Sequence, residues 1–144
     1  MQYPIRKLTI DDYDELITLW ERSGLSHRPK GRDSRESMIP EMERIETFFL
    51  GMYDGEKMIG SILGSFDGRK GWINRLAVDP DYRGKGLAAH LIEECEKQLY
   101  GLGIKVIAAL IEGDNKSSES AFSKAGYGYW DEIKYYSKRF SDDD

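Results

Sequence analysis

The segment from residue 76 to residue 88 has residue types in an order that suits a phosphate-binding loop. Residues 76–78 are apolar and suit a strand, which Pro80 ends because proline cannot donate a hydrogen bond to a neighbouring strand. Glycines at positions 84 and 86 let successive backbone N–H groups turn toward one point. A helix beginning near residue 86 adds its unpaired first-turn amides and the positive end of its dipole. The spacing therefore predicts a backbone site for a pyrophosphate.

Two other glycine-rich loops compete with this interpretation. A nucleotide-binding P-loop has Gly-Lys followed by Ser or Thr, whereas Lys85 is followed by Gly86, so no hydroxyl is available there for Mg²⁺. Positions 84, 86 and 89 match the dinucleotide fingerprint G-x-G-x-x-[G/A]. That fingerprint requires an acidic residue about 20 positions further on, where this chain has the apolar residues 106–109. A dinucleotide loop is therefore disfavoured.

The chain resembles the GNAT superfamily of N-acetyltransferases. The family's cofactor-loop signature, [Gln/Arg]-x-x-Gly-x-[Gly/Ala], is met by Arg83, Gly86 and Ala88. The likeness continues after the next expected strand at Asn115, Ser118, Phe122 and the pair Gly126-Tyr127. Phe122 departs from the family pattern, because many members have a tyrosine there that is thought to protonate the leaving thiolate. Phenylalanine has no proton to give.

The resemblance implies an acetyl-CoA-dependent N-acetyltransferase that works by direct transfer within a ternary complex, with no metal. It also implies that the strands on either side of the loop helix separate to admit the pantetheine arm of coenzyme A, and that backbone N–H groups of residues 76–78 stabilise the thioester oxygen. The expected cofactor-binding residues are Leu76, Ala77, Val78, Arg83, Gly84, Lys85, Gly86, Leu87, Ala88, Asn115 and Phe122. The acceptor is a primary amine of a small molecule or a protein.

The general base is not indicated by the family pattern. An attacking amine must be neutral, so a base or a water relay is needed. Some members have a glutamate on the strand before the loop, but residues 71–75 contain no carboxylate. Glu112, beside Asn115, is the leading candidate; it can equally be a solvated residue at a strand end. With Phe122 in place of tyrosine, a non-catalytic acyl-CoA-binding module remains the alternative, and a nucleotide-binding regulatory domain is a further one.

Composition indicates one compact domain spanning residues 1–144. The 144 residues are 40% hydrophobic, which is enough for a single core, and no run is long enough to cross a membrane. No signal peptide is apparent, so the cytoplasm is the expected compartment. The net charge of −5 argues against nucleic-acid binding, and we expect a monomer or homodimer. The lone Cys95 lies on an apolar helix face and is interpreted as a packing residue.

The expected fold is α/β, with a mixed, mainly antiparallel central sheet flanked by helices in the order β-α-(α)-β-β-β-α-β-α-β. Strands are predicted at residues 3–8, 48–53, 58–66, 70–78 and 104–111, with one or two closing strands within residues 127–140. Helices are predicted from the Thr9 capping box onward, at residues 37–45, after Gly86 and at residues 117–125. Asp-Gly pairs at positions 54 and 67 predict tight turns. The apolar run 104–111 is expected to be a buried central strand. The resemblance also implies that the basic loop 27–32 borders the acceptor site, and a solvated loop is the alternative.

Overall fold

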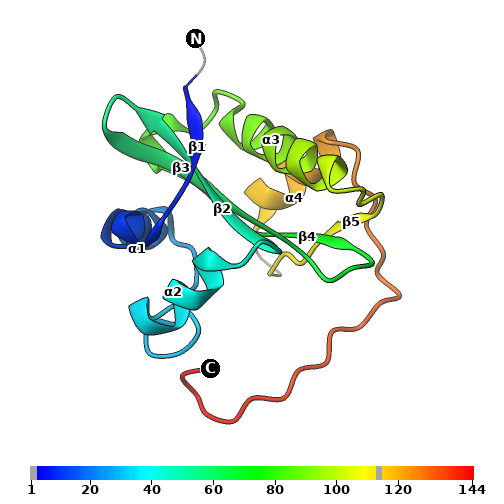
Figure 1. Ribbon diagram of the computed structural model, residues 1–144. Coiled ribbons are helices and arrows are strands. Elements are labelled where there is room, and N and C mark those ends of the chain that lie inside the picture. Colours follow the sequence, from blue (N-terminus) through cyan, green and yellow to red (C-terminus); the bar gives the residue numbers. More distant parts are fainter. Residues whose placement is uncertain (1–2, 113–114) are drawn as a thin grey trace.

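The computed structural model describes residues 3–112 and 115–144, which form a five-stranded sheet with helices on both faces (Figure 1). In chain order the elements are β1 (Ile5–Lys7), α1 (Tyr13–Ser23), α2 (Arg35–Glu43), β2 (Thr47–Asp54), β3 (Lys57–Phe66), β4 (Gly71–Val78), α3 (Leu87–Gly101), β5 (Ile107–Ala109) and α4 (Lys116–Lys124). The strands lie in the sheet in the same order. The first four are antiparallel and β5 is parallel to β4, which confirms the predicted fold class. Among the described residues, no helix combines the length and apolar character needed to cross a membrane.

Hairpin turns set the register of the three long strands. Gly55 and Gly68 are the glycines of the two Asp-Gly pairs that predicted tight turns. They have φ of 62° and 93°, a left-handed backbone that glycine adopts without steric cost. The turns join β2 to β3 and β3 to β4, so both predicted tight turns are confirmed.

Two hydrophobic clusters cover the two faces of the sheet. The face under α1 and α2 is packed by side chains such as Leu16, Trp20 and Met38. The opposite face is packed by α3 and α4, where Leu91 and Cys95 are fully buried. Cys95 is fully buried in this cluster, which confirms its interpretation as a packing residue, and burial raises the pKa of its thiol to about 12.

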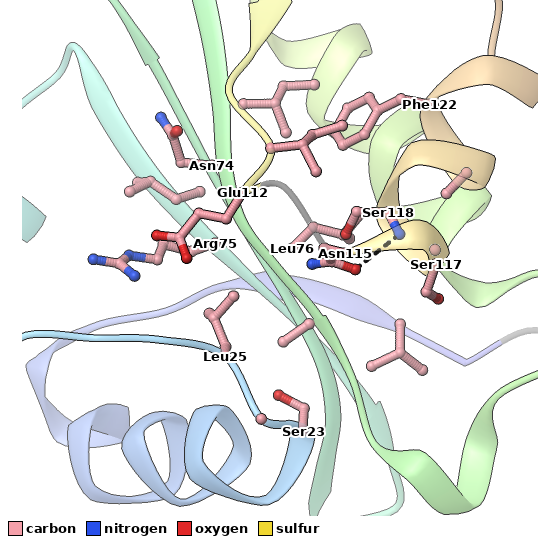
Figure 2. Close-up of a pocket in the computed structure, with 18 of the residues that line it drawn as sticks. Ser23, Leu25, Asn74, Arg75, Leu76, Glu112, Asn115, Ser117, Ser118 and Phe122 are labelled. Carbon is pink, nitrogen blue, oxygen red and sulfur yellow. Dashed lines mark hydrogen bonds between the residues drawn. The ribbon is translucent and has the colours of Figure 1, made fainter. Parts of the chain in front are cut away.

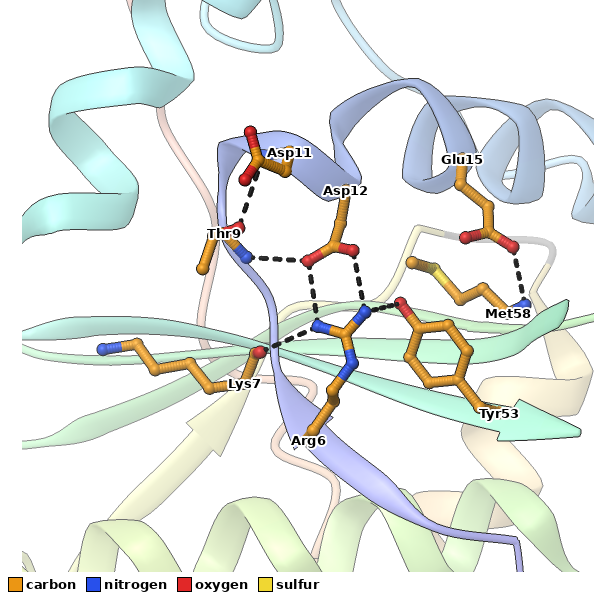
Figure 3. A network of polar contacts seen from close by, with 8 residues as sticks. All are labelled: Arg6, Lys7, Thr9, Asp11, Asp12, Glu15, Tyr53 and Met58. Carbon is orange, nitrogen blue, oxygen red and sulfur yellow. Dashed lines mark hydrogen bonds and ion pairs between the residues drawn. The ribbon is translucent and has the colours of Figure 1, made fainter. Parts of the chain in front are cut away.

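The entry into α1 is fixed by a polar network at the end of β1 (Figure 3). Thr9 and Asp12 form the predicted capping box around the short 3-10 turn Ile10–Asp12. Arg6 donates two hydrogen bonds to Asp12, of 2.8 and 3.0 Å, and a third of 2.9 Å to the Tyr53 hydroxyl on β2. The guanidinium of Arg6 lowers the pKa of the Asp12 carboxyl. One ion pair thus ties the first helix to the sheet.

Two predictions about the end of the chain are wrong. Only Ile107–Ala109 of the expected strand 104–111 is paired, and β5 lies at the edge of the described sheet rather than at its centre. Residues 127–140 form none of the expected closing strands. An apolar run shows that a segment suits a strand, but pairing requires a partner edge, and local sequence does not supply one.

Candidate active site

A cleft of about 1300 Å³ opens where β4 and β5 separate (Figure 2). The two strands pair only from Gly71 to Ile73 on β4, opposite residues 107–109 on β5, whereas β4 continues to Val78. The described part of β4 is therefore unpaired on its β5 side over residues 74–78. The N-terminus of α3, one side of α4 and the loop after α1 form further walls, and Tyr135 and Arg139 of the carboxyl-terminal segment also line the cleft.

The structure brings nearly all of the expected site residues to this cleft. Those that line it are Leu76, Ala77, Val78, Arg83, Gly84, Gly86, Leu87, Ala88, Glu112, Asn115 and Phe122. Lys85 does not line it, and its ammonium lies 5.4 Å from the centre of the Tyr82 ring. The candidate loop and the downstream candidates, which are 24 or more positions apart in the sequence, thus border one space.

The glycine loop has the backbone conformation that the sequence predicts. Gly84 and Gly86 have φ of 79° and 76°, and no heavy atom lies within 4 Å of a Cβ built at either one. Gly86 is the N-cap residue of α3, and the first turn of that helix has no acidic side chain. Arg83 donates a 3.0 Å hydrogen bond to the carbonyl of Ser23, which ties the loop to the end of α1. The open face of the loop presents backbone rather than side chain, as an anion site requires.

A β-bulge on β4 directs one arginine toward the other end of the cleft. Asn74 pairs with Leu63 and Ala77 with Ser61, so β4 has one more residue than β3 in this interval. Within the bulge, Arg75 has φ of 53°, which is uncommon for a residue with a side chain.

The Arg75 side chain is 15% exposed, and its guanidinium lies 5.3 Å from the centre of the Trp20 ring. Burial lowers the pKa of Arg75, and the charge of Asp33 partly offsets this effect.

The Asp33 carboxylate holds the loop between α1 and α2 against this arginine. It accepts hydrogen bonds of 2.8 Å from Arg75 and 2.6 Å from the backbone of Arg28. Arg75 also donates to the carbonyl of Ser26. The basic loop 27–32, expected near the acceptor, is thereby fixed beside the cleft, and Arg32 lines it.

Two glutamates line the same end of the cleft. Glu112 points into it near Arg75 in Figure 2 and is solvent-exposed. Glu41, on α2, is only partly exposed, and this burial raises the pKa of its carboxyl group. The nearby negative charge of Asp33 raises that pKa further, and the positive charge of Arg75 lowers it in part. Sequence reasoning missed Glu41, because nothing in the order of residues 35–43 shows that this side of α2 faces a cleft. Arg75 could have been singled out from the sequence, because it is a charged residue within a largely apolar strand.

On the α4 side, the Asn115 side-chain oxygen accepts a 3.1 Å hydrogen bond from the backbone of Ser118 and caps the helix (Figure 2). Phe122 borders the cleft but is only 5% exposed, and its ring packs edge-on against Tyr127 with centroids 5.1 Å apart. Asn115 is thus the N-cap residue of α4. Within residues 3–112 and 115–144, no group of three or more His, Cys, Asp or Glu side chains is arranged to hold a metal ion.

Comparison with known proteins gives a consistent result. The sequence pattern of the acetyltransferase (GNAT) family matches residues 12–127. An acetyltransferase of Sodalis glossinidius is 36% identical over 139 residues, which cover 96% of each chain. The PaiA N-acetyltransferase of Thermoplasma acidophilum, crystallised with coenzyme A, is 26% identical with a TM-score of 0.76, covering 86% of this chain and 88% of that one. The aminoglycoside acetyltransferase AAC(6')-Iy, crystallised with a bisubstrate analogue, shares the fold at 16% identity and a TM-score of 0.79, covering 96% of this chain and 99% of that one.

Proposed function

The chain belongs to the acetyltransferase (GNAT) family, and from this premise we propose that it transfers an acetyl group from acetyl-CoA to a primary amine by direct attack within a ternary complex. The observation that carries the proposal is a single cleft bordered by both the glycine loop and the unpaired end of β4. We further propose that residues 1–144 act as one catalytic domain.

The glycine loop and the first turn of α3 are proposed to bind the pyrophosphate of coenzyme A. The left-handed backbone at Gly84 and Gly86 leaves N–H groups free to turn toward an anion, and the helix dipole favours negative charge at this point. Leu87 and Ala88 border the same part of the cleft and add first-turn amides. Arg83 contributes by tying the loop to α1, since its guanidinium is bound to a carbonyl there.

The pantetheine arm is proposed to lie between the separated ends of β4 and β5. Residues 74–78 have no partner on the β5 side among the described residues, so the N–H groups that face this side can donate to a bound ligand. Donors aimed at the thioester oxygen would stabilise the negative charge that develops there. Asn115 and Phe122 border this space from α4. The Asn115 oxygen caps the helix, and its amide nitrogen has no hydrogen-bond partner among the described residues.

A carboxylate at the opposite end is proposed to accept the proton of the attacking amine. Glu112 is the candidate that the sequence indicated, and Glu41 is the candidate that the structure adds. A base works best when its pKa approaches the working pH, and burial raises the pKa of Glu41 in that direction. This property favours Glu41.

The acceptor is proposed to be an amine of a small molecule or of a protein that enters between the loop 24–33 and α2. Both signs of charge border this end of the cleft, with Arg32 and Arg75 facing Glu41 and Glu112. A protonated amine would be attracted by the glutamates before it loses its proton. The aminoglycoside acetyltransferase noted above acts on a small-molecule amine within the same fold, which supports this choice of substrate class.

The test is a screen of amine acceptors with acetyl-CoA in which released thiol is measured. It is paired with thermal unfolding in the presence of acetyl-CoA, NAD or ATP. We expect acetyl-CoA alone to raise Tm, because a ligand that binds only the folded chain stabilises it by about 2.7 kcal/mol at a hundredfold excess over Kd. Equal shifts with NAD or ATP would contradict the assignment of the loop. A shift with acetyl-CoA but no thiol release with any amine would favour a binding module.

A further inference from the structure

Residues 79–83, the junction, join the two halves of the proposed cofactor site. They follow residues 76–78 of β4, where the donors to the thioester oxygen are proposed, and they precede Gly84 and the pyrophosphate loop. Acetyl-CoA that fills both halves of the site therefore spans the junction. The position of the junction sets how the two halves lie relative to each other.

A buried carboxylate stands at the start of the junction. The Asp79 side chain is 1% exposed, and a carboxylate is costly to bury unless charged partners and hydrogen bonds replace water. One of its oxygens lies 2.9 Å from Nε and 2.8 Å from Nη2 of Arg22, and 3.6 Å from the Lys57 ammonium. The other oxygen accepts a 2.9 Å hydrogen bond from the backbone of Asp81 and so caps the short 3-10 turn Pro80–Tyr82. Both oxygens thus have partners.

The partners of Asp79 come from separate parts of the fold. Arg22 is in the last turn of α1, and Lys57 is the first residue of β3. The Asp79 backbone also donates a 2.8 Å hydrogen bond to the carbonyl of Ile59 on β3. Burial acts to raise the pKa of Asp79, but the Asp81 N–H and the two positive charges outweigh it and lower the pKa. The start of the junction is therefore held to α1 and β3 by an ionised group.

The rest of the junction is held by groups at the surface. Tyr82 donates a 2.6 Å hydrogen bond to the Asp54 carboxylate at the end of β2, and Arg83 donates to the carbonyl of Ser23. Both of these hydrogen bonds are exposed, so water competes with them, whereas polar contacts in the interior are electrostatically stronger. Asp79 therefore supplies the main side-chain restraint on the junction.

Stability alone does not account for a charged pair at this point. A buried ion pair can often be replaced by apolar side chains without loss of stability. What the pair adds is direction, because a guanidinium and a carboxylate bond only when their N–H groups and oxygens align. Neither Asp79 nor Arg22 lines the cleft, so any effect on the ligand passes through the backbone.

We propose that Asp79 is a positioning residue that, through its ion pair with Arg22, aligns the pyrophosphate half of the cofactor site with the thioester half. This inference rests on the proposed function, because it takes acetyl-CoA as the ligand of the cleft. A donor that fills both halves depends on their alignment, whereas a donor that fills the thioester half alone does not. S-acetylpantetheine is a donor of the second kind, because it lacks the pyrophosphate and the adenosine.

The test measures kcat/KM of Asp79→Asn with acetyl-CoA and with S-acetylpantetheine, using the amine found in the acceptor screen. Asparagine has nearly the same shape and keeps an oxygen for the Asp81 N–H, but it loses the charge that holds Arg22. A misplacement of about 1 Å can cost about a hundredfold in rate, so we expect a fall of about tenfold or more with acetyl-CoA and of less than about threefold with S-acetylpantetheine. Equal falls with the two donors, or no fall with acetyl-CoA, would overturn the proposal, since a general loss of structure affects both donors alike.

Two other variants make the comparison specific. Arg22→Met removes the partner of Asp79 at a side chain that is 36% exposed, so it can be studied even if Asp79→Asn does not fold, and it should show the same difference between donors. Asp12→Asn is the matched control, because Asp12 also pairs with an arginine, its side chain is 13% exposed, and neither Asp12 nor Arg6 lines the cleft. It should leave the ratio of the two donors unchanged, and the same difference between donors in this control would overturn the proposal.

A failure of the proposed function gives a different result from a failure of this inference. If no amine releases thiol with the wild-type chain, the proposed transfer reaction is wrong, and calorimetry with coenzyme A then tests Asp79. We expect Kd to rise about tenfold or more in Asp79→Asn and Arg22→Met and to stay unchanged in Asp12→Asn. A Kd that stays unchanged in the first two variants would overturn the positioning role, and a wild-type chain that binds no coenzyme A would overturn both proposals.

Discussion

Gly86→Asp is the sharpest test of the proposed phosphate site, because it changes charge at the residue where the glycine loop becomes α3. The site has room for the side chain, since no heavy atom lies within 4 Å of a Cβ built there. The backbone is left-handed, with φ of 76°, so any side chain adds about 1–2 kcal/mol of strain to the fold. The aspartate is not expected to recover this by capping α3, because N-cap side chains bond the helix from an extended backbone.

The effect on the ligand is larger than the strain and of a different kind. Two unit charges about 5 Å apart repel by about 3 kcal/mol at an effective dielectric constant of 20, and about 1.4 kcal/mol already changes Kd tenfold. We therefore expect the Kd for coenzyme A, measured by calorimetry, to rise between about tenfold and a hundredfold. Added salt should reduce the difference, because it screens exposed charges.

Two further variants separate charge from strain. Gly86→Ala adds the strain without the charge and should leave the affinity for coenzyme A nearly unchanged. Gly103→Asp adds the same charge at another left-handed glycine, with φ of 87° and open space around its Cβ, outside the cleft. A folded Gly86→Asp variant that binds coenzyme A as tightly as Gly103→Asp would refute the placement of the pyrophosphate.

Three other changes test the base, the aromatic position and the entry to α1. Glu41→Gln should lower kcat/KM about a hundredfold or more. It should also remove the decline of kcat/KM toward acid pH that the raised pKa of Glu41 predicts, whereas Glu112→Gln should keep that decline. The opposite pattern in the pH profiles of the two variants would assign the base to Glu112. Phe122→Tyr should lower the free energy of unfolding, measured in urea, by about 1–3 kcal/mol without faster turnover. The residue is only 5% exposed, so the added hydroxyl would be buried without a hydrogen-bond partner. A variant that is faster and equally stable would reject that reasoning. Asp12→Asn should reduce the loss of folding stability at acid pH, because the pKa of Asp12 is lowered in the folded chain. The stabilisation by this carboxylate is present above its ordinary pKa of 3.8 and is lost as the pH falls through the folded value. Equal losses of stability below about pH 4 in the variant and the wild type would contradict this.

Features set by neighbouring residues were predictable from the sequence. The Thr9 capping box, the Asp-Gly turns and the left-handed glycines at 84 and 86 all depend on residues within a few positions of one another. The helix α3 between β4 and β5 also agrees with their parallel pairing, because parallel neighbouring strands need such a crossover. These local signals were enough to give the fold class and one wall of the cleft.

Features set by distant residues were not predictable in the same way. The Arg75–Asp33 pair joins residues 42 positions apart, and Glu41 faces the cleft only because α2 packs beside that pair. The strands expected within residues 127–140 are missing for a related reason. A strand needs an edge to pair with, and the local sequence of a segment does not say where that edge lies.

The β4 bulge explains how one irregularity serves both ends of the cleft. A left-handed Arg75 costs about 1–3 kcal/mol, so the surrounding contacts must more than offset it. Arg75 contacts Asp33, the carbonyl of Ser26 and the ring of Trp20, and these contacts hold the loop 24–33 beside the proposed acceptor end of the cleft. The same extra residue shifts the register of β4 just before residues 76–78, where the proposed oxyanion donors lie. The strain at Arg75 thus couples the position of the acceptor loop to the alignment of the backbone on which the proposed chemistry depends.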